Sequence, residues 1–350
     1  MLPLATRPAP RRRQLQTDFI AAILVKAVII KLGALGDIIM STPIIKSLVA
    51  EHKNDDLYLL TSPPYAELFN DWPGLTVKQV PRKGLAASFK SVCWLRSLGF
   101  DRVYDLQSND RSRILCSLSS IEEKVGNHNC YPYTHHPGDM YRGQNHIFDR
   151  HKQLLASVDI TVVETAPWLP VPLQAHERVR LWLQAHSLDD KKLVLMHAGA
   201  SVLHPRKRWP HFLTLAETLA ASGYTVVWLG ADDDADINAR LADVVGIDAS
   251  NAFSIVELIA LAQKSLLAIT NDSGPMHVLA CASLPVYALF GPTNWRRNHA
   301  IGQREHVISL NKSNSVWLAE DYVDVDTGDL ALISAEMVCS LLLKENQIRQ

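Results

Sequence analysis

Three short segments place acidic, basic or hydroxyl side chains directly after an expected buried strand. They are residues 31–43 (KLGALGDIIMSTP), 196–210 (MHAGASVLHPRKRWP) and 270–280 (TNDSGPMHVLA). Ligands of α/β proteins bind beyond the carboxyl ends of the strands, so we expect the three segments to share one site. A carboxylate, a lysine and a helix start beside small residues could together activate a hydroxyl and bind a diphosphate.

The first segment joins a strand to a helix through a glycine turn. Gly33 and Gly36 allow a tight turn and the close approach of a ligand, but the spacing is not that of a dinucleotide fingerprint. Asp37 stands at the start of the helix. Two interpretations remain open for its carboxylate: it complements the helix dipole, or it serves as a general base facing a cleft.

The second segment ends its strand in small residues. Gly199 and Ala200 leave room for a diphosphate, and Ser201 adds a hydroxyl. Lys207 follows just before an expected helix, where an ammonium could neutralise a leaving pyrophosphate. The alternative is that residues 206–208 form a solvated basic run.

The third segment is the most informative. Asp272 and Ser273 are expected to cap a helix that Pro275 begins, and Gly274 removes bulk. The N–H groups at such a helix start favour an anion. His277 lies in the first turn, so it either donates to a phosphate or is a satisfied core histidine.

The elements that must position these residues alternate between strands and helices. Short apolar runs at 27–31, 57–60, 77–80, 102–106, 193–197, 225–229, 266–270 and 286–290 predict strands, and helical patterns separate most of them. We expect helices at 38–52, 65–69, 89–98, 151–158, 177–186, 210–221, 236–244, 254–263 and 275–282, and a loop at 126–150. The alternation predicts an α/β fold with two Rossmann-like domains facing a cleft.

Three prolines at residues 165–172 mark the expected linker between the domains. We therefore predict a disordered basic tail at 1–17, one domain at 18–168 and a second at 169–350, with the last helix packing back on the first domain.

Composition excludes several classes of protein. A net charge of -1 argues against a nucleic-acid binder, and five cysteines without a C-x-x-C argue against a disulfide framework or a zinc site. The sequence has no long uncharged apolar run and no signal-peptide pattern, so we expect a cytoplasmic protein. The acidic run 232–234 could hold a metal as D-x-D or simply start a helix; we predict the helix start and no metal site.

Taken together, the motifs K-L-G-A-L-G-D, H-A-G-A-S…K-R-W-P and N-D-S-G-P-M-H resemble those of glycosyltransferase family 9, the ADP-heptose:lipopolysaccharide heptosyltransferases. They follow the family order over roughly residues 27–300. The resemblance implies a GT-B fold and an inverting, metal-independent transfer with ADP-heptose as co-substrate and no cofactor.

The resemblance also assigns residues to roles. Asp37 corresponds to the catalytic base, and Lys207 to the lysine on the donor phosphates. The donor-binding set is completed by Gly199, Ala200, Ser201, Asp234, Asp272, Ser273, Gly274, Met276 and His277, with Asp234 expected on the ribose hydroxyls.

The implied acceptor is the lipopolysaccharide inner core or a related glycan at the inner membrane surface. Such acceptors are acidic, so Arg82, Lys83, Arg111 and Arg113 are the candidates that would bind one. We infer no nucleic acid and no obligate protein partner, and a location either in the cytoplasm or peripheral on the cytoplasmic face of the inner membrane. A sugar-nucleotide epimerase or hydrolase, and a non-catalytic glycan-binding relative, remain the alternatives.

Overall fold

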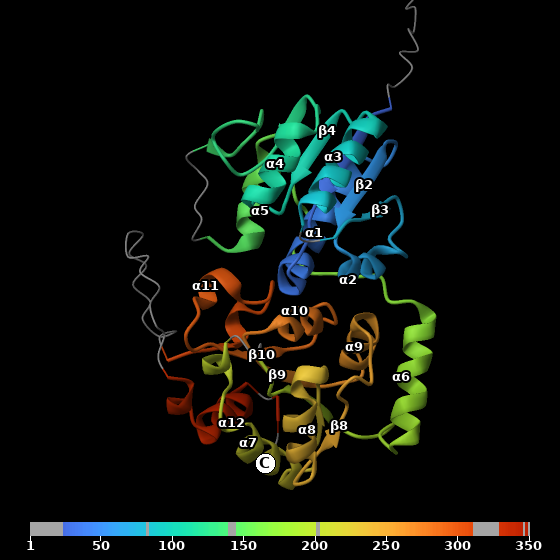
Figure 1. Cartoon of the computed structure of the whole chain (residues 1–350). Coiled ribbons are helices and arrows are strands. Elements are labelled where there is room, and N and C mark those ends of the chain that lie inside the picture. The colour runs from blue at the N-terminus through green and yellow to red at the C-terminus, as the bar shows by residue number, and fades with distance from the viewer. Residues whose placement is uncertain are drawn as a thin grey trace, which may run out of the picture.

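The computed structural model describes residues 24–81, 84–138, 145–200, 204–310, 329–345 and 347–348. Within them the chain forms two parallel sheets with helices packed on them, one half above the other in Figure 1. The expected α/β fold class is confirmed. The tail 1–17 and the candidate residues Arg82, Lys83 and Ser201 lie outside the described residues.

The first sheet is formed by five parallel strands in the order β3-β2-β1-β4-β5. Their bounds are β1 Lys26–Ile30, β2 Asp56–Thr61, β3 Thr76–Gln79, β4 Arg102–Asp105 and β5 Glu123–Val125. The central strand β1 is almost wholly apolar, as a strand covered on both faces must be.

The helices of this half are α1 Leu35–Glu51, α2 Pro63–Ala66, α3 Leu85–Leu98, α4 Asp110–Leu118 and α5 Ile147–Ala156. Helix α4 was not predicted; a capping box between Asn109 and Ser112 starts it. The prediction of a loop to residue 150 was wrong at its end, because α5 begins four residues before His151. His146 caps this helix by accepting a hydrogen bond from the Phe148 N–H.

The second sheet has six parallel strands in the order β11-β10-β9-β6-β7-β8. They are β6 Leu193–His197, β7 Thr225–Trp228, β8 Ile247–Asp248, β9 Leu267–Asn271, β10 Val286–Leu289 and β11 Val307–Ile308. The helices are α6 Leu173–Ala185, α7 Phe212–Ala221, α8 Ala235–Ala242, α9 Ile255–Ala262, α10 Gly274–Ala280, α11 Trp295–Asn298 and α12 Ala335–Lys344.

The last helix does not pack back on the first half as expected. Val338 and Leu342 of α12 lie in one apolar cluster with Phe212 and Leu215 of α7, in the second half. A hydrogen bond of 2.7 Å from the indole N–H of Trp209 to the Ile333 carbonyl also holds this segment there.

The two halves share an apolar contact between α1 and α10. Val278 of α10 and Cys281, which directly follows this helix, belong to the same buried cluster as Ile38 and Ile44 of α1. The chain crosses between the sheets through residues 157–172, which form neither helix nor strand. Figure 1 shows α1 directly above α10, so two helix starts from distant parts of the sequence come together.

Candidate active site

The first turns of α1 and α10 touch each other through glycine. A Cβ added at Gly36 would lie 2.6 Å from Cδ2 of His277, and one added at Gly274 would lie 3.1 Å from Cδ2 of Leu35. Real Cβ atoms do not come as close as 2.6 Å, so the contact at Gly36 requires glycine. The motif G-D of the first half is thereby fixed against the motif D-S-G-P-M-H of the second.

This contact yields a prediction for Gly36→Ala. The added methyl would collide with the buried ring of His277, and overpacking of this kind costs about 1–3 kcal/mol in unfolding free energy. Urea unfolding should show that loss, and Gly36→Ala should cost much less when it is introduced into His277→Ala, where the ring is absent. A Gly36→Ala protein as stable as the wild type would show that the contact is not close.

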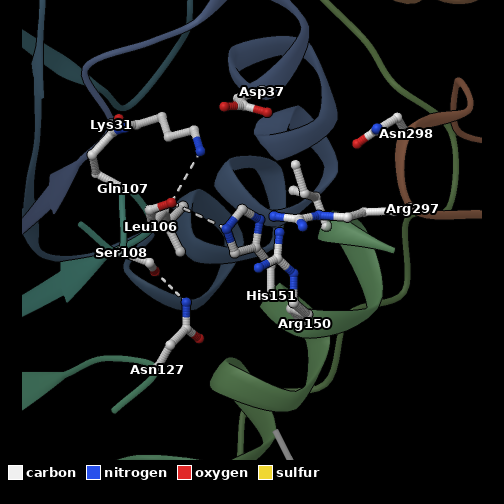
Figure 2. A pocket seen from close by; sticks show the side chains of 11 residues that line it. Lys31, Asp37, Leu106, Gln107, Ser108, Asn127, Arg150, His151, Arg297 and Asn298 are labelled. Carbon is white, nitrogen blue, oxygen red and sulfur yellow. Dashed lines mark hydrogen bonds between the residues drawn. The ribbon is translucent and has the colours of Figure 1, made fainter. Parts of the chain in front are cut away.

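Asp37 lies on the wall of a cavity of about 400 Å³. Its half-buried side chain is in the first turn of α1, one residue after Gly36. Figure 2 shows the side chains around it. The other lining residues come mostly from the first half, with two from α11: Lys31, Leu106, Gln107, Ser108, Asn127, Ile147, Arg150, His151, Arg297 and Asn298.

Two buried groups share one carbonyl in this cavity. The Lys31 ammonium donates to the Leu106 oxygen at 3.0 Å, and His151 Nε2 lies 3.1 Å from the same oxygen. Burial lowers the pKa of Lys31 to about 8, although Asp37 and Asp105 oppose the shift. Burial also holds the pKa of His151 well below its ordinary value, with Lys31 and Arg150 adding to the effect. The imidazole is therefore neutral at pH 7.

A buried carboxylate shapes the loop that carries Leu106. Asp105 accepts hydrogen bonds from the hydroxyls of Tyr133 and Ser112 and from the N–H groups of Gln107 and Ser108. Burial raises the pKa of Asp105, while these four donors pull it down. The segment D-L-Q at residues 105–107 therefore supports the cavity wall from behind.

On the facing half, Lys207 and Asp272 form an ion pair of 2.7 Å. Thr293 also donates to the same carboxylate oxygen at 2.6 Å. Lys207 comes from a short 3-10 helix, η3 Pro205–Lys207, and Asp272 from the turn after β9. Lys207 is thus not a member of a purely solvated run, since it is tied to the third motif.

Asn271 joins the second and third motifs and was not singled out from the sequence. Its fully buried amide donates to the carbonyls of Ala198 and Gly199, each at 3.0 Å, and its oxygen accepts from the Trp209 N–H. A buried asparagine at the end of a strand, followed by D-S-G-P, was the signal that could have identified it.

The capping expected of Asp272 and Ser273 does not occur, because both side chains have other partners. Helix α10 has no side-chain cap, since Asp272 pairs with Lys207 and the Ser273 hydroxyl lies 3.1 Å from Nδ1 of His197. His197 in turn contacts Asp234, because its Nε2 lies 3.3 Å from Oδ2 of that carboxylate.

Asp234 is buried and directed inward. A Cβ added at Gly199 would lie 1.8 Å from Oδ1 of Asp234, so only glycine fits beside this carboxylate. Burial alone would raise the pKa of Asp234, but His197 and the Ala231 N–H lower it overall. Its assignment to the ribose hydroxyls stays a prediction.

Met276 is fully buried, and His277 is 6% exposed. Burial lowers the pKa of His277 to about 4 against the opposing charges of Asp272 and Asp37, so the ring is neutral at pH 7. Its Nδ1 has no hydrogen-bond partner among the described residues. The structure thus brings the histidine of the third motif beside the aspartate of the first.

The arginines expected to bind an acceptor lie on α4. Arg111 donates to the Pro81 carbonyl at 2.8 Å, and Arg113 to the Tyr131 carbonyl at 3.1 Å. Neither lines the cavity of Asp37, where the guanidinium groups belong to Arg150 and Arg297 instead. The acceptor assignment of Arg111 and Arg113 stays a prediction.

In the described part of the chain, no group of three or more His, Cys, Asp or Glu side chains is placed to hold a metal ion. Across the same residues, the helices are too short or too polar to cross a membrane. The acidic run 232–234 forms a short 3-10 helix before α8, in keeping with a helix start.

Residues 90–321 match the family model of glycosyltransferase family 9 (heptosyltransferase). A curated relative from Haemophilus influenzae, lipooligosaccharide heptosyltransferase 2, is 26% identical over 162 residues. That alignment covers 43% of this chain and 46% of the relative, so the chain spans less than half of the relative's length.

Two solved structures share the fold over almost the whole chain. A family 9 glycosyl transferase from Veillonella parvula has a TM-score of 0.76 at 23% identity, covering 91% of this chain and 96% of that one. The ADP-heptose lipopolysaccharide heptosyltransferase II of Escherichia coli has a TM-score of 0.68 at 20% identity, covering 92% and 100%. The GT-B fold expected from the motifs is confirmed.

Proposed function

The chain belongs to glycosyltransferase family 9, and from that premise we propose that it transfers heptose from ADP-heptose to the lipopolysaccharide inner core or a related glycan. One observation carries the proposal. The turn with Asp37 and the turn with Asp272 are held together by the contact of Gly36 with His277. Asp37 from one half and Lys207 from the other can then act on the same substrate bond, the one that joins the sugar to the diphosphate.

The chemistry is a single in-line displacement at the anomeric carbon. The acceptor oxygen forms the new bond, the bond from that carbon to the β-phosphate oxygen breaks, and ADP leaves. Asp37 accepts the proton of the attacking hydroxyl as general base. Attack from the side opposite the leaving group inverts the anomeric configuration.

The leaving diphosphate needs positive charge, and Lys207 supplies it in this proposal. Its ammonium is held at 2.7 Å from Asp272, in the turn that precedes α10. Gly199 and Ala200 keep the neighbouring turn small, and Asn271 holds this turn by donating to the carbonyls of Ala198 and Gly199. With a lysine in this place, we propose that no metal ion is required.

The acceptor is proposed to enter on the side of the first half. That half contributes most of the lining of the Asp37 cavity, and Arg150 and Arg297 add positive charge to it. The guanidinium groups suit the phosphates and acidic sugars of a lipopolysaccharide core. Such an acceptor would be met at the cytoplasmic face of the inner membrane.

Calorimetric binding of ADP, UDP, GDP and NAD in the presence of EDTA tests the donor and the metal together. We expect ADP to bind most tightly, with the chelator having no effect on affinity or on turnover. Preference for UDP or GDP would overturn the donor, and loss of binding or turnover with EDTA would overturn metal independence.

A further inference from the structure

Lys31 is a buried cation for which the proposed reaction gives no role. Its side chain is 3% exposed, and its ammonium donates one hydrogen bond, to the Leu106 carbonyl. An ammonium carries three N–H donors, and no other hydrogen bond of this group is formed within the described residues. Burying a charged donor without partners is costly. The remaining donors are therefore placed for a ligand in the cavity that Lys31 lines.

The cavity sets Lys31 opposite Asp37 with space between them. Figure 2 shows the ammonium and the carboxylate facing the same space. The two charges influence each other, yet both residues are described and no ion pair joins them. A group that fits there can donate to Asp37 and accept from Lys31 at once. Adjacent oxygens of a sugar ring have this character, since one can donate a proton while the next accepts.

The position of the cavity indicates that its ligand is the acceptor and not the donor. Nine of its lining residues belong to the first half, and the donor turn with Lys207, Asp272 and His277 contributes none. The Leu106 carbonyl, which also binds His151, fixes where the ammonium points.

We propose that Lys31 orients the acceptor over Asp37 by donating hydrogen bonds to a sugar oxygen next to the attacking hydroxyl. This inference rests on the proposed function and adds a specificity-determining residue to it. Lys31 binds oxygen atoms of the acceptor sugar. These hydrogen bonds determine which hydroxyl of the acceptor lies next to the carboxylate of Asp37.

The test is a steady-state comparison of Lys31→Met with the wild type, varying each substrate in turn. Methionine keeps the length and the burial of the side chain but has no donor. The acceptor KM should rise about tenfold or more, as for the loss of a hydrogen bond from a charged group. The KM for ADP-heptose and the affinity for ADP should not change.

Lys26→Met is the matched control. Lys26 begins the same strand, and its ammonium likewise donates to a carbonyl, that of Leu98 at 3.3 Å, at the other end of β1. We expect its acceptor KM to equal that of the wild type. An unchanged acceptor KM in Lys31→Met, or a raised KM for ADP-heptose instead, would overturn the inference. If the wild type itself transfers no heptose, the proposed function fails first, so the two failures are distinct.

A measurement on the wild type keeps the inference testable if Lys31→Met does not fold. The pKa of Lys31 is about 8, so the protonated donor is present below that pH and lost above it. Thus kcat/KM for the acceptor should fall as the pH rises through about 8. Values that stay level through this range would contradict a charged Lys31 in acceptor binding.

The other charged groups facing Lys31 do not produce this fall of kcat/KM, the alkaline limb of the pH profile. They are Asp37 on α1, Asp105 at the end of β4, Arg150 and His151 on α5, and Arg297 on α11. Arginine stays protonated throughout, and His151 is already neutral there. A general base becomes active when it loses its proton, so titration of Asp37 would make kcat/KM rise with pH and not fall. Where Lys31→Met folds, it keeps both carboxylates, so a fall that the variant loses belongs to Lys31.

Discussion

Asp37→Ala should lower turnover about 100-fold or more, the usual scale for losing a general base, while ADP binds as tightly as before. The reason is the position of the carboxylate. It lies on the cavity wall, on the side of the first half, whereas the proposed donor contacts belong to the second half. The assay is multiple-turnover heptosyl transfer, with ADP affinity measured by calorimetry on the same preparation.

The competing interpretation of Asp37 is a purely structural one. An acid in the first turn of a helix stabilises it by about 0.3–1 kcal/mol through the helix dipole. Glu336 occupies the same kind of position in the first turn of α12, away from the cavity. We expect Glu336→Gln to change stability by a similar amount and turnover not at all. If Asp37→Ala retained turnover and lost only stability, Asp37 would be a helix-dipole residue and not the base.

Lys207→Ala is expected to weaken ADP binding about tenfold or more, because charge-assisted hydrogen bonds to a phosphate are strong ones. The substitution also leaves the carboxylate of Asp272, 7% exposed, without its cation. Isothermal titration of ADP into the variant and the wild type measures the effect directly.

Arg206→Ala is the control for Lys207, since both residues lie on the short helix η3 and Arg206 is exposed. Removing this charge should leave ADP affinity nearly unchanged, as expected for an exposed residue outside the proposed site. Unchanged ADP affinity in Lys207→Ala would refute the phosphate role. Equal losses in both variants would mean that general positive charge, and not the ammonium of Lys207, attracts the nucleotide.

The sheets were predictable because their strands are short apolar runs of the kind that fully covered strands require. The run AVII and the run LVLM lie at the centres of the two sheets as β1 and β6. Periodicity also located most helices, although their observed ends differ from the predicted ones by a few residues. The positions after these strands follow from topology alone, which is why Asp37 and Asp272 could be expected near one site.

The missed helix α4 and the misplaced start of α5 depend on local hydrogen bonds and not on periodicity. Helix α4 starts at the Asn109–Ser112 capping box, and α5 is capped at its start by His146, a residue type that rarely caps helices. The last helix was misplaced because an amphipathic pattern says which face is buried but not against which partner. Its partner is α7, more than a hundred residues earlier in the chain.

The cavity wall could not be predicted from motifs. Lys31, Leu106 and His151 come from three separate segments and meet only through the folded backbone, with one carbonyl receiving both donors. Arg297 reaches the cavity from the second half, so no local spacing could indicate it. The ion pair of Lys207 with Asp272 is another long-range contact, and it replaced the capping expected of Asp272.

The most direct test of the central claim is transfer itself. Purified protein, ADP-heptose and heptose-deficient lipopolysaccharide should together give a heptosylated glycan with an inverted anomeric centre and one ADP for each heptose added. Without acceptor, ADP-heptose should persist. Consumption of ADP-heptose in the absence of acceptor would indicate a hydrolase or an epimerase, and no reaction despite tight ADP binding would contradict heptosyl transfer to this acceptor.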